Sequence, residues 1–270
     1  LLAHLEAEDP EIAERLVSRR MAILQGAGTS AAVAAGIGLA TAPVALAALA
    51  RDAFGQSTRL PAVVITVLNF ALTLEYLESA FYMKGVASGI IPSSDQAIFN
   101  TINTHEAQHV VALKSTLGSS ARPSPTFDFT AGGKFPTVFS DYSTFTALAQ
   151  AFEDTGVRAY KGQAPALMPY KSVLTTALTI HSVEARHAAE VRRLRGGFTN
   201  QGPYHKGWID GAMTDIPGTS GTYAGEDNTV HAGIDLAQHS TASVMHIQEA
   251  FDEPLTMAQV LAIAGNFIKP

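Results

Sequence analysis

Two similar stretches decide the fold: TINTHEAQH at residues 101–109 and TIHSVEARH at residues 179–187. Each contains a Glu-x-x-His motif. Residues three apart in a helix share one face, so each stretch would present a carboxylate beside an imidazole. The motif residues are Glu106 and His109 in the first copy and Glu184 and His187 in the second, at an offset of 78 residues.

The same offset of 78 residues relates two further pairs of residues. Glu75 corresponds to Glu153, and Tyr82 corresponds to Tyr160. One Glu-x-x-His motif is weak evidence, whereas two copies in register with two Glu-x6-Tyr units indicate an internal duplication of a helix pair. We therefore expect the two halves to be related by a pseudo-two-fold axis.

The glutamates of this repeat lie in apolar surroundings, which points to metal binding. Glu75 follows FALTL and Glu153 follows FTALAQAF. Four carboxylates that converge in a dry core repel one another and cost several kcal/mol each if unpaired. Two divalent cations would balance them. The sequence predicts a two-metal site made by Glu75, Glu106, His109, Glu153, Glu184 and His187.

Four helical patterns carry these residues, so we expect an all-α four-helix bundle. The segment between the second and third patterns is too long for a hairpin and suits a long crossover over the bundle end. Ser93 or Ser94 is expected to cap the second helix, Gly118 to end it, and Gly85 and Gly89 to mark the exit of the first. The expected helices span 61–88, 94–117, 143–163 and 170–194, and the crossover spans 119–142.

Some residues near the site admit two interpretations. Glu78 lies three residues after Glu75 and is the alternative ligand, but its counterpart at the 78-residue offset is Gly156, so Glu75 is preferred. Tyr82 and Tyr160 either donate hydrogen bonds to the ligand carboxylates and influence catalysis, or they are ordinary core tyrosines. His181 and His105 are not expected to be ligands. Other histidines show no ligand spacing.

Composition excludes several classes of site and partner. The 270 residues are 47% hydrophobic and 16% charged, with a net charge of −6 and no long basic run, so a nucleic-acid partner is not expected. Cysteine is absent. Disulfides and thiolate metal sites are therefore excluded, and the metals must be held by oxygen and nitrogen ligands.

The N-terminal segment, residues 1–56, is expected to be a leader or anchor. Residues 1–17 have an amphipathic pattern, and residues 21–50 contain no charged residue. Arg19-Arg20 before this apolar stretch, with Ala48-Leu49-Ala50 after it, is typical of an export signal. The alternative is a retained helix that contacts a membrane or an assembly. Residues 199–270 are expected to be a loop-rich C-terminal extension packed on the bundle, with a final helix over 256–267.

The pattern of one Glu from each of two helices and Glu-x-x-His from the other two resembles the ferritin-like superfamily. The stretches LNFALTLEYLESAFY, AFEDTGVRAYKG and IHSVEARHAAEVRRLRG resemble more closely the desiccation-related ferritin-like proteins, which often carry a twin-arginine leader. The resemblance implies a ferritin-like bundle over 57–198, with Glu106 and Glu184 bridging both ions. It also implies export to the periplasm or to the outer side of the inner membrane.

Two hypotheses on function follow. The first is an oxidoreductase of stress protection, whose two ions, iron first and manganese second, react with dioxygen or peroxide. Without cysteine it would lack the iron-sulfur relay of rubrerythrins. The second is a metal-stapled structural protein attached to a membrane or assembly through residues 21–50. A homo-oligomer is compatible with either hypothesis, whereas an iron-storage cage is disfavoured because the terminal appendages would crowd a closed shell.

Overall fold

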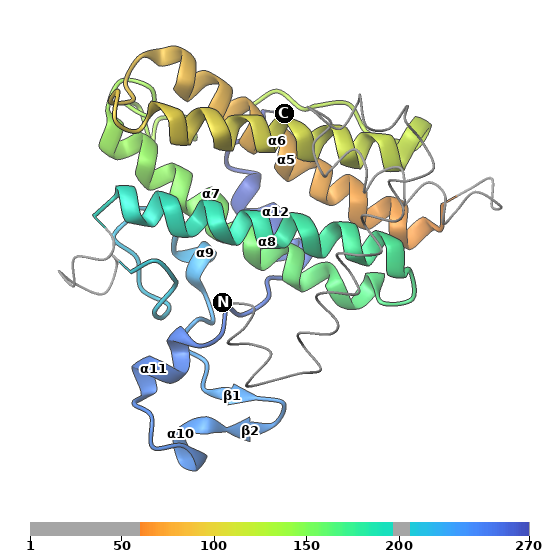
Figure 1. Ribbon diagram of the computed structural model, residues 1–270, viewed down its shortest axis with the longest axis vertical. Coiled ribbons are helices and arrows are strands. Elements are labelled where there is room, and N and C mark those ends of the chain that lie inside the picture. Colours follow the sequence, from red (N-terminus) through yellow and green to blue (C-terminus); the bar gives the residue numbers. More distant parts are fainter. Residues whose placement is uncertain (1–59, 197–205, 270) are drawn as a thin grey trace, which may run out of the picture. The chain divides into compact units, whose positions relative to one another are not determined.

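The computed structural model describes residues 60–196 and 206–269 (Figure 1). The expectations for the N-terminal leader, including the apolar stretch 21–50, fall outside the described residues.

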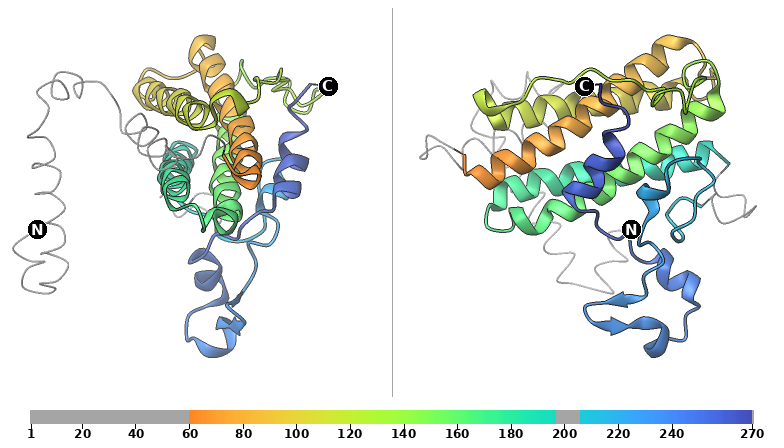
Figure 2. Two further views of the ribbon diagram at one scale, coloured as in Figure 1. Left: turned by 90° about the vertical axis from the view of Figure 1, so that its right-hand side faces the viewer. Right: turned by 180° about the vertical axis from the view of Figure 1, so that it is seen from behind.

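Four long helices form the bundle and confirm the expected fold class. They are α5 (Ala62–Ser88), α6 (Gln96–Leu117), α7 (Tyr142–Leu167) and α8 (Lys171–Leu194). α5 packs against α6, α7 packs against α8, and α5 also contacts α7. Each sequential pair is antiparallel, and α6 and α7 run in the same direction (Figures 1 and 2). The two helix pairs of the sequence repeat are thus the two halves of the bundle.

The helix ends follow local chemistry, with two differences from expectation. Gly89 ends α5 at φ 77°, a left-handed conformation that glycine adopts without strain, and Gly118 ends α6. Asp95, not Ser93 or Ser94, is the N-cap of α6. Gly85 is not an exit but lies inside α5, where a β-carbon would come 2.3 Å from Cε2 of Phe145. Close packing of α5 on α7, rather than helix termination, requires glycine there.

The connection from α6 to α7 is long, as expected, but its path differs. After a short 3-10 helix, η2 (Gly118–Ser120), it runs along the length of the bundle rather than only across one end (Figure 2). Because α6 and α7 are parallel, the chain must travel back before α7 begins. Phe127, Phe129 and Phe135 of this connection are buried in the hydrophobic core. The crossover is therefore anchored by aromatic side chains.

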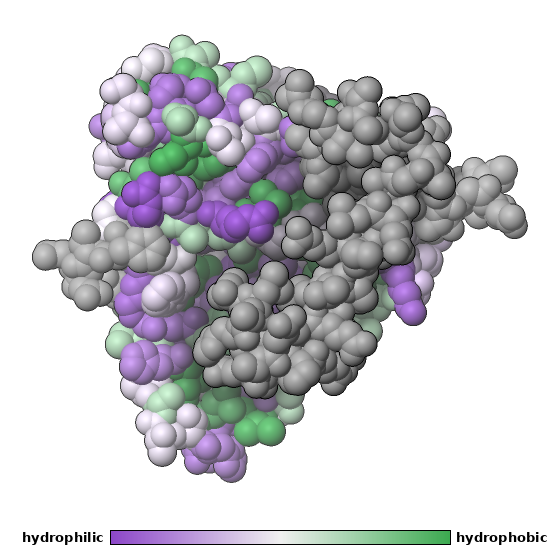
Figure 3. Space-filling view, in the orientation of Figure 1, coloured by the Kyte–Doolittle hydropathy of each residue, from purple (hydrophilic) through white to green (hydrophobic). Residues whose placement is uncertain are grey.

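The bundle core is apolar and aromatic around α5. Phe81 is fully buried and stacks on Phe145 with ring centroids 4.9 Å apart. By length and composition α5 could cross a membrane, but 61% of its most apolar window is buried inside the structure, as in the core helix of a bundle. On the face shown in Figure 3, hydrophilic and hydrophobic side chains are interspersed over the described surface.

The C-terminal part contains short elements and one helix that packs on the bundle. α12 (Met257–Ala264) contacts α7, and Thr256 caps it with a reciprocal capping box to Gln259. The chain after α12 pairs with the crossover, where Asp128 N–H donates to the Phe267 carbonyl over 2.7 Å. The short elements are α9 (Ser220–Tyr223), β1 (Val230–His231), β2 (Ile234–Asp235), α10 (Leu236–His239) and α11 (Val244–Glu249), with β1 and β2 antiparallel.

A buried arginine ties this C-terminal part to α7. Arg158 is fully buried and lies 2.7 Å from Glu226, and its Nε donates to the Glu253 carbonyl over 2.7 Å. One turn later, the absent side chain of Gly162 lets the Leu255 carbonyl approach α7, because a β-carbon there would lie 1.9 Å from that oxygen. Contacts from α7 to Glu226 and to backbone carbonyls of the C-terminal part thus fix this part on the bundle.

Candidate metal centre

The structure brings all six predicted metal-site residues together inside the bundle. Glu75 comes from α5, Glu106 and His109 from α6, Glu153 from α7, and Glu184 and His187 from α8. The four glutamates have no exposed surface, and both histidines are buried. The i, i+3 spacing on α6 and α8 places each Glu beside its His, as the helical period requires.

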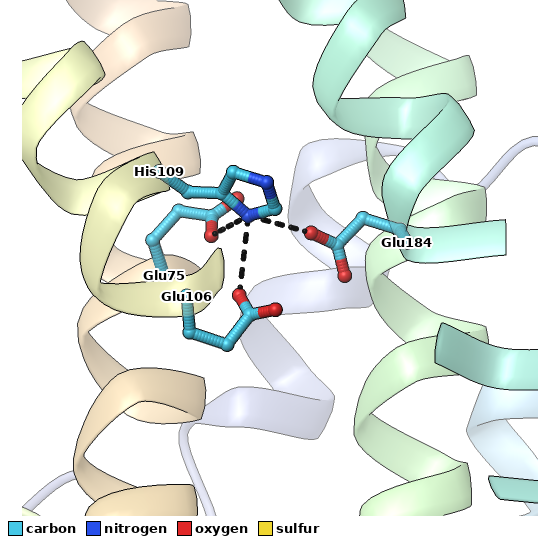
Figure 4. A group of neighbouring side chains, drawn as sticks. All are labelled: Glu75, Glu106, His109 and Glu184. Carbon is cyan, nitrogen blue, oxygen red and sulfur yellow. Dashed lines mark hydrogen bonds and ion pairs between the residues drawn. The ribbon is translucent and has the colours of Figure 1, made fainter. Parts of the chain in front are cut away.

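His109 faces three carboxylates. Its Nδ1 lies 3.1 Å from Glu75 Oε2, 3.2 Å from Glu106 Oε2 and 3.1 Å from Glu184 Oε1 (Figure 4). Figure 4 shows these side chains pointing toward one another from α5, α6 and α8. The imidazole nitrogen nearest the carboxylates is therefore Nδ1.

His187 occupies the equivalent position in the second half. Its Nδ1 lies 2.8 Å from Glu106 Oε1 and 3.4 Å from Glu153 Oε2. The His109 and His187 ring centroids are 6.2 Å apart. Each half thus offers one Nδ1 to a common set of carboxylates.

The ligand atoms form two overlapping groups, and each group suits one ion. Within a group, one ligand atom per residue lies within 4.8 Å of all the others. Glu106 and Glu184 belong to both groups. The first group is Glu75, Glu106, His109 and Glu184, and the second is Glu106, Glu153, Glu184 and His187.

The two tyrosines of the repeat hydrogen-bond across the two halves. Tyr82 on α5 donates its hydroxyl to Glu153 on α7, and Tyr160 on α7 donates to Glu75 on α5. Because both pairs follow the 78-residue offset, the contacts are exchanged by a pseudo-two-fold relation. Both tyrosines are buried. They are therefore hydrogen-bond donors to the carboxylates rather than ordinary core tyrosines.

Burial and charge strongly shift the protonation of this site. Burial raises the pKa of Glu75 to about 7, and burial with the charge of Glu106 raises the pKa of Glu184 well above its usual value. Burial also raises the pKa of Glu106, but His109 and His187 outweigh it and hold that pKa below its ordinary 4.5. Burial lowers the pKa of His187, yet Glu153 and Glu106 raise it to about 11. Without cations, protons on the imidazoles must offset the carboxylates.

Unpaired buried atoms show that the donor set fits cations. His187 Nδ1 lies 2.8 Å from Glu106 Oε1, yet neither atom has a hydrogen-bond partner. Buried polar atoms without hydrogen bonds are costly, and oxygen with imidazole nitrogen suits iron or manganese. Within the described part of the chain, the site atoms without a hydrogen-bond partner are Glu106 Oε1, Glu153 Oε2, both Glu184 oxygens and His187 Nδ1.

A fifth carboxylate lies beside the two groups. Glu78 is only 3% exposed, and burial with the charge of Glu184 raises its pKa well above the usual value. A β-carbon at Gly156 would lie 3.2 Å from Glu78 Oε1 and 3.3 Å from Glu184 Oε2. Glu78 belongs to neither ligand group. It occupies space that the glycine at the equivalent position of the other half leaves open.

His105 touches the site in a way that the motif did not reveal. Its Nδ1 lies 3.0 Å from Nε2 of His187, and the two rings stack at 5.3 Å. The outer nitrogen of His187 therefore has a partner that can fix the tautomer and ring orientation. The residue equivalent to His105 in the other half is Val183, so the repeat gave no signal for this contact.

One comparison with known proteins agrees with this geometry. Residues 64–197 match the model of the ferritin-like domain family. The matched segment contains all four bundle helices except the first residues of α5, and it contains every residue of the two ligand groups. A comparison with curated proteins found no match. The fold and site together define a ferritin-like four-helix bundle with buried carboxylate and histidine groups that could hold metal ions.

Proposed function

We propose that this protein is a di-metal oxidoreductase that reacts with dioxygen or peroxide. The observation that carries the proposal is the pair of overlapping ligand groups that share Glu106 and Glu184 in the buried core. Two carboxylate-bridged ions of iron, or else manganese, would supply the redox chemistry when bound.

Some residues would hold both ions of such a centre, and others would hold only one. Glu106 and Glu184 lie within reach of both positions and would bridge them. Glu75 with His109 would complete one position, and Glu153 with His187 the other. Three further residues, Tyr82, Tyr160 and His105, would orient the ligands by hydrogen bonds.

The source of electrons is constrained by composition. Since the chain has no cysteine, it offers no thiolate for an iron-sulfur relay of its own. Electrons would come from Fe(II), from an external donor, or from a second peroxide in disproportionation. A ferroxidase or a peroxide-consuming activity therefore fits better than a self-contained reductase.

The cellular setting is part of the proposal and rests on sequence. The Arg19-Arg20 pair and the apolar stretch 21–50 support export to the periplasm or to the outer side of the inner membrane. The resemblance to desiccation-related ferritin-like proteins supports a role in stress protection. Residues 21–50 could also attach the protein to a membrane or an assembly, and a homo-oligomer is compatible with this arrangement.

The test is metal content beside turnover. We expect the purified full chain, after loading with Fe(II) or Mn(II), to hold two ions and to consume dioxygen or hydrogen peroxide. Variants that lose the ions should lose the consumption. Protein that holds two ions and consumes neither reactant would contradict the oxidoreductase proposal.

Protein that holds two ions without consuming either reactant would favour a metal-stapled structural protein. The observation that favours this alternative is the burial of the site. Its four glutamates, Glu75, Glu106, Glu153 and Glu184, have no exposed surface. A centre that holds four helices together can stabilise a fold without turnover.

A further inference from the structure

A second site lies on α7, outside the metal-ligand groups. A cavity of about 300 Å³ opens between α7, α9, α12 and the crossover. We name it the α7–α12 cavity. Its walls include Leu148, Ala151 and Phe152 of α7, Ala262 and Ile263 of α12, and Phe267 after α12. Figure 2 shows α12 lying across α7 in the view from behind.

The chemistry of this cavity suits a small amphiphilic molecule. Its floor is apolar, since Leu148, Ala151, Phe152 and Phe267 are all buried. Its rim is polar, with Lys134 donating to Asn266 Oδ1 over 3.2 Å. Among the described residues no carboxylate forms an ion pair with Lys134. Cavities of this size and character are typical of small-molecule sites, which combine apolar walls with a few polar groups.

The cavity lies close to the metal centre. A much smaller cavity, of about 10 Å³, shares Phe152 and Ile263 with it and is also lined by Glu78 and Gly156. That volume is about the space of one water molecule. Oxygens of Glu78 and Glu184 both lie beside Gly156, which has no side chain. The large cavity and the small one thus share Phe152 and Ile263, and the small one reaches Glu78 beside the ligand groups.

The small cavity lies where the two halves of the bundle differ in sequence. Gly156 stands where the other half has Glu78. Glycine inside a helix is destabilising relative to alanine, so its presence in the middle of α7 is unfavourable unless the space is used. A side chain at residue 156 would meet Glu78 and Glu184, whose oxygens lie 3.2 and 3.3 Å from the position of a β-carbon.

We propose that the α7–α12 cavity binds a small amphiphilic organic anion beside the metal centre, with its apolar body against Phe152 and Phe267 and its anionic end at Lys134. Its binding alters the surroundings of the metal centre through the small cavity and Glu78, and this second part rests on the proposed di-metal function. Binding itself requires no metal, so the two parts can fail separately.

The binding test uses the dye anilinonaphthalene sulfonate, which has aromatic rings and one anionic group, and the metal-free full chain. We expect saturable dye fluorescence with one main site. Ala262→Trp fills the cavity from an exposed position on α12 and should weaken binding at least about tenfold. The matched control is Ala258→Trp, also exposed on α12 but outside the cavity, which should bind like wild type. Circular dichroism checks that both variants are folded.

Two results would overturn the binding site: a wild-type protein that does not bind the dye, or equal binding by both tryptophan variants. Lys134→Glu should weaken dye binding at least about threefold, and unchanged affinity would overturn the placement of the anionic end at Lys134.

The link to the centre is tested on metal-loaded protein, where saturating dye should shift the visible spectrum of the centre in wild type and Ala258→Trp but not in Ala262→Trp. An unshifted wild-type spectrum would overturn the influence of the cavity on the centre and leave the di-metal function standing.

Discussion

Glu106 and Glu184 are the residues on which the whole centre depends, because both belong to both ligand groups. We expect Glu106→Ala or Glu184→Ala to abolish binding of both ions. Glu75→Ala and Glu153→Ala should each weaken mainly one ion, since each belongs to one group. Metal content by mass spectrometry after dialysis measures the difference.

The control is Glu190→Ala, a residue of α8 in an exposed pair with Arg193. It should keep two ions. Removal of a buried carboxylate also relieves repulsion, so the metal-free variants should stay folded. Full metal occupancy in Glu106→Ala would show that the shared groups are not the ligand set.

Tyr82 and Tyr160 should matter for rate more than for metal content. Tyr82→Phe and Tyr160→Phe each remove one hydroxyl that donates to a ligand carboxylate. Loss of such an outer hydrogen bond typically costs about 10- to 100-fold in affinity or activity. We expect two ions to remain at millimolar metal, with slower consumption of Fe(II) or peroxide. Rates equal to wild type in both variants would limit the tyrosines to packing.

The metal-free protein should lose stability as pH rises. Burial raises the pKa of Glu75 to about 7 from 4.5, and Glu153 and Glu106, opposed by burial, raise the pKa of His187 to about 11 from 6.5. The folded chain therefore holds protons that the unfolded chain releases, first between pH 4.5 and 7 and then between 6.5 and 11. Stability from these groups is present at low pH and is lost as pH rises through the folded values.

Thermal melting between pH 5 and pH 9, with and without metal, measures this effect. We expect a lower melting temperature at pH 9 without metal, and each 1 kcal/mol should correspond to roughly 2–4 °C. Metal affinity should change in the opposite direction, rising with pH, because bound ions displace these protons. A metal-free protein that becomes more stable from pH 5 to pH 9 would contradict the protonation scheme.

The sequence predicted the residues of the site, but it did not predict the contacts of the residues that lie beside them. The duplication predicted which six side chains converge, and it favoured Glu75 over Glu78 because Gly156 cannot ligate. The contact of His105 with His187 and the position of Glu78 beside Gly156 could not be predicted, because both break the repeat. A pattern based on symmetry carries no information about residues that depart from it.

Among the elements, α7 has a second task, which is to hold the C-terminal part through Arg158. Arg158→Leu would leave Glu226 buried without its partner 2.7 Å away. Breaking one member of a buried pair costs about 3–5 kcal/mol, so the free energy of unfolding should fall by that order. Chemical denaturation measures it, and limited proteolysis should show earlier cleavage in residues 206–256.

The matched control is Arg193→Leu on α8, which removes an exposed ion pair with Glu190. Exposed pairs contribute about 0–1 kcal/mol, so this variant should unfold close to wild type. Equal losses in the two variants would mean that the Arg158 contacts do not fix the C-terminal part.

Helix positions followed from the sequence, whereas the path of the connections did not. The apolar period and the glycine stops placed each bundle helix within a few residues. The exception is Asp95, which directly follows Ser93 and Ser94; Ser and Asp are both favoured N-cap residues, so propensity does not rank them. The course of the crossover depends on where Phe127 and Phe129 are buried, which local sequence does not specify.

At the scale of the whole molecule, the described bundle is built from two similar halves around one buried cluster of charge. The exchanged hydrogen bonds of Tyr82 and Tyr160 follow this relation, whereas Glu78, Gly156 and His105 depart from it. The symmetric part corresponds to the proposed ligand set. Glu78 and Gly156 line the small cavity beside the α7–α12 cavity, and they make the two sides of the centre chemically different.

The central claim is that these two groups hold two metal ions. The most direct measurement is anomalous diffraction above and below the metal absorption edge, on crystals of the full chain loaded with Fe(II) or Mn(II). We predict two anomalous peaks inside the bundle, both in contact with Glu106 and Glu184, with one beside His109 and the other beside His187. A single peak, or peaks only outside the bundle core, would contradict the account.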